Sequence, residues 1–185
     1  MFFEFRPCTL EMDYDAYIKF LLRHHDELNL PYKFAMKLSF LGSPLLLGKA
    51  VLAISEEPYE IVGAAGFVYG TGANDYEDTH ICQVEVAFIR KEYRRTSLFI
   101  RGLRALLDEM KAGNPDVEKI QFWTSASADK EELGTLLSKI SALPGSTKSI
   151  VNRLSFYTIS FHELESYCHR FKTISSDRRN EVRFY

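Results

Sequence analysis

The sequence lacks any long apolar run, and this absence excludes a large class of proteins. No stretch approaches the roughly 18 apolar residues that a membrane-spanning helix requires. The opening residues, MFFEFRPCTL, also lack the basic region and long apolar segment of a signal peptide. We therefore expect a cytoplasmic protein that does not interact with membranes.

Cysteine and an excess of positive charge are lacking as well. Cys8, Cys82 and Cys168 are odd in number and have no C-x-x-C spacing, so neither a disulfide framework nor a metal site is expected. Reduced thiols are typical of the cytosol. The chain has 23 Lys and Arg against 25 Asp and Glu, whereas a nucleic-acid-binding domain usually has a basic excess. The composition therefore argues against a nucleic-acid partner.

The composition that is present indicates one globular domain. The chain has 185 residues, of which 46% are hydrophobic and 26% charged. This length is sufficient to bury a core without disulfides. We expect one domain over residues 1–172 and a polar C-terminal tail over residues 173–185.

Periodicity and turn residues predict an α/β protein with a mixed sheet. Strands are predicted at 2–6, 49–55, 60–69, 80–89, 118–124 and 149–161. Helices are predicted at 13–28, 31–41, 96–111, 129–141 and 162–171, with Asp13 as the N-cap of the first. A hairpin followed by strand–helix–strand implies antiparallel pairs early and a parallel pair late. Strand 80–89 should be central, with helix 96–111 packed across it.

The two faces of strand 80–89 differ in polarity. One face is predicted to be entirely apolar and consists of Cys82, Val84, Val86 and Phe88. The other face has Gln83 and Glu85 in its middle. Polar side chains inside such an apolar strand require partners or solvent. They therefore line a cleft or lie on an exposed face of the sheet.

Basic residues surround the predicted start of helix 96–111, and they are Arg90, Lys91, Arg94 and Arg95. Thr96 or Ser97 can cap this helix. A helix N-terminus presents unpaired N–H groups and the positive end of the helix dipole. This combination predicts a phosphate-binding turn, although a solvated turn before an ordinary helix would contain the same residues.

The stretch VEVAFIRKEYRRTSLFIRGLRALL resembles motif A of the Gcn5-related N-acetyltransferase (GNAT) family, a strand, a turn Arg/Gln-x-x-Gly-x-Gly/Ala and a helix. Arg94 falls on the first position of the turn, Ser97 on its first glycine and Phe99 on its second. The opening EFRPCTLEMDYDAYIKFL also resembles the family's first strand and helix. The order of elements agrees over residues 2–161. The resemblance implies a GNAT-like fold with a central twisted sheet of about six or seven strands flanked by helices.

The same resemblance implies an N-acyltransferase that transfers an acetyl or other acyl group from coenzyme A to a primary amine by direct attack. The donor would be acetyl-CoA or another acyl-CoA, without a metal. The residues implied to bind the donor are Ala87, Phe88, Ile89, Arg94, Arg95, Thr96, Ser97, Leu98 and Phe99. The sequence does not identify the acceptor amine, and it leaves a homodimer open.

Glu85 is the first candidate for the catalytic base. A lysine-like amine has a pKa of about 10.4, so it must lose a proton before it attacks, and a nearby carboxylate can accept that proton. His80 is the second candidate. The family's proton-donating tyrosine falls on Leu137, so another acid is needed. Candidates for that acid are Tyr157, Tyr69 and Ser138.

Two alternatives remain open at the level of sequence. The missing glycines and tyrosine favour a catalytically inactive domain of the same fold that binds a partner or senses a ligand. A second alternative is an acyltransferase whose donor is attached to a carrier protein. In that case the basic turn would contact a phosphopantetheine rather than a whole coenzyme A.

Overall fold

The computed structural model describes residues 2–28, 30, 32–94, 96–125 and 134–180 of the chain. The strands within these ranges are β1 (Phe3–Pro7), β2 (Gly48–Glu56), β3 (Tyr59–Tyr69), β4 (Ile81–Ile89), β5 (Lys119–Ser125), β6 (Thr147–Val151) and β7 (Leu154–Ser160). The α-helices are α1 (Glu11–Arg23), α2 (Phe34–Leu47), α3 (Leu98–Gly113), α4 (Gly134–Ser141) and α5 (Phe161–Asn180). Short 3₁₀ turns, η1 (Gly72–Asn74) and η2 (Lys91–Tyr93), precede and follow β4.

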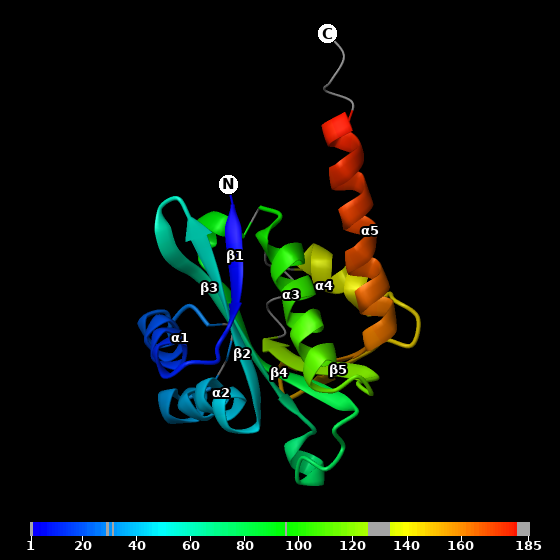
Figure 1. Cartoon of the computed structure of the whole chain (residues 1–185). Helices are drawn as coiled ribbons and strands as arrows, with labels where there is room; N and C mark the ends of the chain where they lie inside the picture. The colour runs from blue at the N-terminus through cyan, green and yellow to red at the C-terminus, as the bar shows by residue number, and fades with distance from the viewer. Residues whose placement is uncertain (1, 29, 31, 95, 126–133, 181–185) are drawn as a thin grey trace.

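The seven strands form one mixed sheet in the order β1-β2-β3-β4-β5-β7-β6 (Figure 1). The β4–β5 pair is parallel, and the other neighbouring pairs are antiparallel. β4 is the fourth strand in this order, which confirms the predicted central position of residues 80–89. The predicted hairpin and the late parallel pair are confirmed as β2–β3 and β4–β5.

Helices cover the sheet on both faces (Figure 1). α1 and α2 lie on one face, and α3, α4 and α5 lie on the other. Alternate residues of β2 enter different cores: Val51 packs with α3 and α5, whereas Leu52 packs with α1 and α2. The sheet therefore separates two hydrophobic layers.

The first helix begins earlier than predicted. Glu11 is its first residue and Leu10 is its N-cap, so the prediction of Asp13 as N-cap is wrong. Asp13 lies inside the first turn, where its Oδ2 accepts hydrogen bonds from the N–H groups of Leu10 at 3.1 Å and Thr9 at 3.3 Å. Asp13 still stabilises the start of the helix, because these donors have no partner within the helix itself.

α2 corrects a second boundary. The helix predicted to end at residue 41 continues through Gly42, Ser43 and Pro44 to Leu47. The Pro44 ring packs on the sheet above Gly66, where an added Cβ would lie 2.6 Å from Pro44 Cγ. Packing of Pro44 against the sheet therefore stabilises α2 and offsets the cost that a proline has inside an isolated helix.

Two further boundaries differ at the C-terminal end. The single strand predicted over 149–161 is a hairpin of β6 and β7, turned by Asn152 and Arg153 with φ values of 50° and 66°. Two consecutive positive φ values are typical of a tight type I′ hairpin turn. The backbone of α5 continues to Asn180, well past the predicted end at residue 171. The predicted start of helix 129–141 lies outside the described residues.

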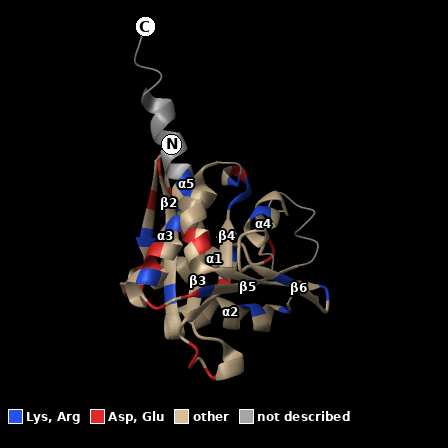
Figure 2. Cartoon of the chain, turned by 90° about the vertical axis from the view of Figure 1, so that its right-hand side faces the viewer, with Lys and Arg blue, Asp and Glu red and all other residues tan. Residues whose placement is uncertain are grey.

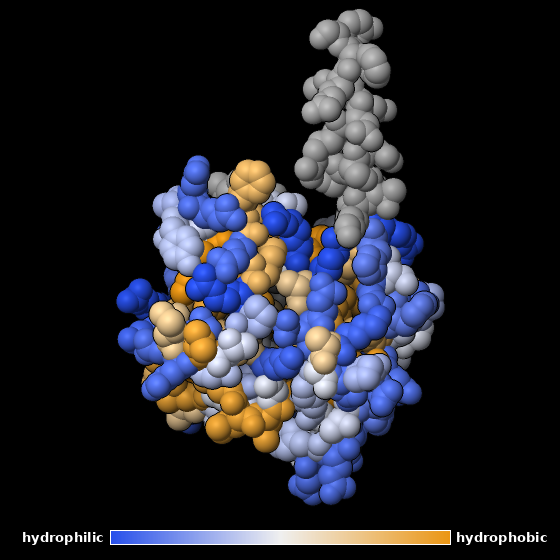
Figure 3. Space-filling model, in the orientation of Figure 1, coloured by the Kyte–Doolittle hydropathy of each residue, from blue (hydrophilic) through white to orange (hydrophobic). Residues whose placement is uncertain are grey.

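Surface properties are mixed. Figure 2 shows Lys and Arg interspersed with Asp and Glu along the chain. Figure 3 shows hydrophobic side chains gathered over α2, where the exposed residues are Phe34, Met36, Leu38, Leu46 and Leu47.

Within the described ranges, no helix is both long and apolar enough to cross a bilayer. All three cysteines are free and buried.

Candidate active site

β4 and β5 separate halfway along the sheet. Residues Ile81–Val84 pair with Lys119–Phe122, after which β4 continues to Ile89 and β5 to Ser125. Among the described residues, these two strands share no registered pair beyond that point. Backbone amides that no strand pairs can hydrogen-bond a ligand. The second half of the central strand therefore offers an edge for binding.

A β-bulge interrupts β4 where the strands separate. Val84 pairs with Phe67 and Val86 pairs with Gly66, so Glu85 is an extra residue on β4. A bulge changes which face the following side chains occupy. Consequently Val84 packs in the α3–α5 layer, whereas Val86 packs in the α1–α2 layer.

The prediction of one continuous apolar face is therefore wrong. Cys82 packs in the α3–α5 layer with Val84, but Phe88 packs in the α1–α2 layer with Val86. The residues beyond Glu85 take the opposite faces from those that simple alternation assigns.

Glu85 is buried, with 8% of its surface exposed. Gln83 Nε2 donates a hydrogen bond to Glu85 Oε1 at 2.7 Å. Burial raises the pKa of the Glu85 carboxyl above its ordinary value, and the hydrogen bond from Gln83 offsets part of that rise. Ser43 of α2 also lowers the pKa of Glu85 through its side chain, and Tyr17 of α1 interacts electrostatically with Glu85.

The Tyr17 hydroxyl near Glu85 is buried, and it has no hydrogen-bond partner in the described part of the chain. Burial raises the pKa of the Tyr17 hydroxyl, and the charge of Glu85 raises it further. Buried polar groups normally have partners. The unused hydrogen-bonding capacity of Tyr17 therefore indicates a place for a polar ligand group or a water molecule beside Glu85.

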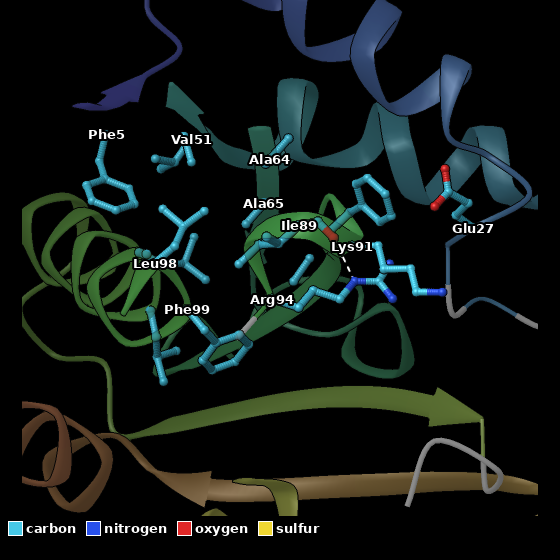
Figure 4. Close-up of a pocket in the computed structure, with 17 residues that line it drawn as sticks. Phe5, Glu27, Val51, Ala64, Ala65, Ile89, Lys91, Arg94, Leu98 and Phe99 are labelled. Atoms are coloured by element: carbon cyan, nitrogen blue, oxygen red, sulfur yellow. Dashed lines mark hydrogen bonds between the residues drawn. The ribbon is translucent and has the colours of Figure 1, made fainter. Parts of the chain in front are cut away.

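A cavity of about 540 Å³ lies along the free part of β4 and under the first half of α3 (Figure 4). Its size falls within the range of about 300–1,000 Å³ that small-molecule sites have. Its walls come from β1, β2, β3, β4 and α3, and the charged residues that line it are Glu27, Lys91 and Arg94. Ala87 is exposed although it belongs to the central strand, because it faces this cavity.

Two of the basic residues of the turn, Lys91 and Arg94, lie at the cavity. Arg94 Nε donates to the carbonyl oxygen of Ile89 at 2.8 Å, and its guanidinium lies 5.6 Å from the centre of the Phe88 ring. These contacts hold the Arg94 side chain against β4 at the cavity. Lys91 lines the same cavity.

Arg90 does not join them, because it pairs with Glu60 at 2.7 Å and with Glu92. Arg95 lies outside the described residues. Of the four basic residues that the sequence places around the helix start, the structure therefore brings Lys91 and Arg94 to the cavity.

The start of α3 is fixed by Thr96. Its hydroxyl donates to the carbonyl oxygen of Tyr93 at 2.7 Å and accepts from the N–H of Leu98 at 3.2 Å. Ser97 is the N-cap, and its side chain makes no capping bond. The Leu98 side chain is fully buried, whereas Phe99 is half-buried and lines the cavity. The first turn of α3 thus opens onto the cavity, as an anion site at a helix N-terminus requires.

His80 and Tyr157 lie away from this cavity. His80 directly precedes β4, seven residues before Ala87, which is about 23 Å at roughly 3.3 Å per residue of strand. Tyr157 is fully buried and stacks on Phe122, with ring centres 4.9 Å apart. Neither residue is among those that line the cavity.

The other candidate acids have different surroundings. The Tyr69 hydroxyl donates to the Met110 carbonyl oxygen at 3.0 Å, and burial raises its pKa to about 12. Ser138 is exposed on α4. Among the described residues, no group of three or more His, Cys, Asp or Glu could hold a metal ion.

Sequence reasoning missed the position of Tyr17 and Glu27. Tyr17 lies on the buried face of α1 and is fully buried. Its hydroxyl was the available signal, because a buried hydroxyl requires a partner. Glu27 follows α1 in an irregular segment and lines the cavity, and no local pattern marks it.

A seven-stranded mixed sheet, a bulged central strand that separates from its parallel neighbour and a helix that starts beside the opening together define the GNAT acetyltransferase fold. Comparison with solved structures confirms this fold, although a scan of protein-family models finds no match and a search of curated proteins finds no significant relative.

A GNAT-family acetyltransferase from Staphylococcus aureus is 18% identical, with a TM-score of 0.57 over 85% of this chain and 99% of that one. The spermidine N-acetyltransferase of Vibrio cholerae, solved with CoA and spermine, is 12% identical, with a TM-score of 0.55 over 88% and 97% of the two chains. An IAA acetyltransferase from Bacillus cereus is 10% identical, with a TM-score of 0.57 over 85% and 99%. At these identities the likeness establishes the fold.

Proposed function

We propose that this protein is an N-acyltransferase that transfers an acyl group from a coenzyme A thioester to a primary amine. One observation carries the proposal: the free edge of β4, the first turn of α3 and the cationic side chains of Lys91 and Arg94 border one cavity. A pantetheine arm contains amides that can pair with a strand edge, and its pyrophosphate is an anion. The cavity combines both kinds of partner.

Donor binding divides between these two parts of the site. Lys91, Arg94 and the N-terminal N–H groups of α3 would hold the pyrophosphate. The backbone of Ala87–Ile89 would hydrogen-bond the pantetheine amides and polarise the thioester carbonyl. A fixed N–H donor stabilises the negative charge that develops on that oxygen during attack. Phe99 stands where motif A has a small residue, so its ring contacts the donor or shapes the pocket beside it.

The reaction requires one proton acceptor. The amine nitrogen attacks the thioester carbonyl carbon, a C–N bond forms and the C–S bond breaks. Because Glu85 is buried and does not line the cavity, it would accept the proton that the amine loses through a water molecule held by Tyr17. Its raised pKa brings the carboxylate closer to neutral pH, where a general base is most effective. The departing thiolate takes up a proton, and because a thiol has a pKa of about 8.5, it leaves without an obligatory acid.

A binding module of the same fold is the second candidate. The observation that favours it is the N–H of Leu98, which the Thr96 hydroxyl already engages, so one donor at the helix start is occupied. Such a module would bind coenzyme A or another anion without turnover.

Calorimetric titration with coenzyme A, followed by a transfer assay, separates the candidates. The assay would detect free thiol released from acetyl-CoA in the presence of a polyamine, an amino acid or a lysine-containing peptide. We expect coenzyme A to bind and at least one amine to release thiol above the rate of hydrolysis. Binding without turnover for every amine supports the binding module. Absence of binding at millimolar coenzyme A would refute the acyltransferase and leave only a module that binds another anion.

A further inference from the structure

The cavity has two chemically different ends (Figure 4). Glu27, Lys91 and Arg94 lie at one end, where the basic turn follows β4. Phe5 and Val51 lie at the other end, under α3. Because a phosphate would bind at the charged end, the apolar end needs a different occupant.

Small residues create the space under α3. The sheet contributes Ala53, Gly63 and Ala65 to the cavity wall, and α3 contributes Gly102. In contrast, the second half of α3 packs tightly, because Leu107 and Met110 are buried in the core that α3 shares with α5. The helix is therefore close-packed over one half and leaves a cavity under the other.

The apolar end is closed at β1. A Cβ built on Gly102 would lie 3.4 Å from Phe5 Cε1, so helix and strand meet there. Arg101 Nη2 donates to the carbonyl oxygen of Phe3 at 3.1 Å and holds α3 against β1. The cavity is thus a pocket that opens beside β4 and ends at β1.

This pocket extends further than an acetyl group reaches. β2 and β1 are the second and third strands from β4, which places them about 10–14 Å away at roughly 4.8 Å per strand. A pantetheine arm that follows β4 runs along the strand and does not cross the sheet toward β1. An acyl chain attached to the thioester can instead extend across the sheet toward β1.

We propose that the pocket between the first half of α3 and strands β1–β3 binds the acyl chain of the donor, and that the donor is an acyl thioester with an apolar chain of medium length. This inference rests on the proposed function, because the chain is placed by the thioester at β4. Its lining of Phe5, Val51, Ala53 and Ala65 is apolar, and burial of each methylene tightens binding about fourfold. An acetyl donor would leave this surface without a partner.

Calorimetric titration of the intact protein with coenzyme A, acetyl-CoA, octanoyl-CoA and decanoyl-CoA tests the inference. We expect decanoyl-CoA to bind about 100-fold more tightly than acetyl-CoA, because burial of roughly three to four of its methylenes, at about fourfold each, gives that factor. Equal affinities for the acetyl and decanoyl thioesters would overturn the acyl-chain pocket and leave the proposed function standing. Absence of binding for all four compounds would instead overturn the proposed function.

Titration with free decanoate tests whether the pocket binds a fatty acid rather than an acyl thioester, since Lys91 and Arg94 could also attract the carboxylate of a fatty acid. We expect decanoate to bind far more weakly than decanoyl-CoA. Equal affinity for these two ligands would overturn the assignment to the donor.

A variant locates the chain. Ala53→Leu fills the pocket near β1, and we expect it to reduce the ratio of decanoyl-CoA to acetyl-CoA affinity toward one. Ala112→Leu, on the exposed end of α3, is the matched control and should retain the wild-type ratio. A wild-type ratio in folded Ala53→Leu would overturn the location. If Ala53→Leu fails to fold, Ala65→Leu replaces it with the same expectations.

Discussion

Replacement of Glu85 by glutamine tests the proposed chemistry at one atom. The substitution keeps the shape of the side chain and an oxygen that can accept the 2.7 Å hydrogen bond from Gln83, but it removes the basic carboxylate. Loss of a general base typically lowers kcat by about 10²–10⁴-fold, which corresponds to about 3–5 kcal/mol in the activation barrier. Glu85 does not line the cavity, so coenzyme A should bind Glu85→Gln with wild-type affinity.

The pH dependence supplies a second signature of Glu85. Burial raises its pKa, so wild-type activity should rise with pH as the carboxyl ionises, and Glu85→Gln should lose this acidic limb. The raised pKa also affects stability, because it means that the folded state binds this proton more tightly than the unfolded state. Wild-type stability should therefore fall as pH rises from the ordinary carboxyl pKa through the raised one. Glu85→Gln cannot titrate, so its stability relative to the wild type should increase over the same interval.

Steady-state kinetics, calorimetry and urea unfolding across pH measure these effects. Glu118→Gln is the matched control, because Glu118 is exposed immediately before β5, and it should retain wild-type kcat and pH dependence. Wild-type kcat in Glu85→Gln, with an unchanged acidic limb, would refute the assignment of Glu85 as the base.

Two further substitutions probe the bulge and the basic turn. Gly66→Ala should destabilise the protein by about 1–3 kcal/mol in urea unfolding, because its Cβ would lie 2.4 Å from the Tyr17 hydroxyl and 2.6 Å from Pro44 Cγ; unchanged stability would contradict this packing. Arg94→Ala should weaken coenzyme A binding about tenfold and reduce its salt dependence, since it removes a charged hydrogen-bond donor. The control Lys139→Ala on α4 should leave the affinity for coenzyme A unchanged in the same calorimetric titration.

Local patterns were sufficient to predict the framework of the fold. The apolar run of residues 80–89 predicted β4 and its central position, and the periodicity of residues 96–111 predicted α3. The strand, its position and the helix are confirmed. The hairpin of β2 and β3 was also predictable, because Glu56–Tyr59 separate two strand-like runs and include a proline. These signals depend on neighbouring residues alone.

The details that shape the site depend on contacts distant in sequence. The bulge at Glu85 arises from pairing with Gly66 and Phe67 of β3, so alternation within β4 could not reveal it, and the faces of Val86 and Phe88 were assigned wrongly. Retention of Pro44 in α2 likewise depends on the sheet beneath it. The turn at Asn152 was detectable, because asparagine is favoured at positive φ, but the apolar residues on both sides disguised it as one strand.

The central claim is that the cavity beside the free edge of β4 binds the acyl donor, and a crystal structure of the protein with coenzyme A tests it most directly. We predict that the pyrophosphate lies at the first turn of α3, within hydrogen-bonding distance of Arg94, and that the pantetheine follows Ala87–Ile89. Coenzyme A bound on another surface of the protein, with the β4 edge and the Arg94 side chain free of it, would contradict the claim.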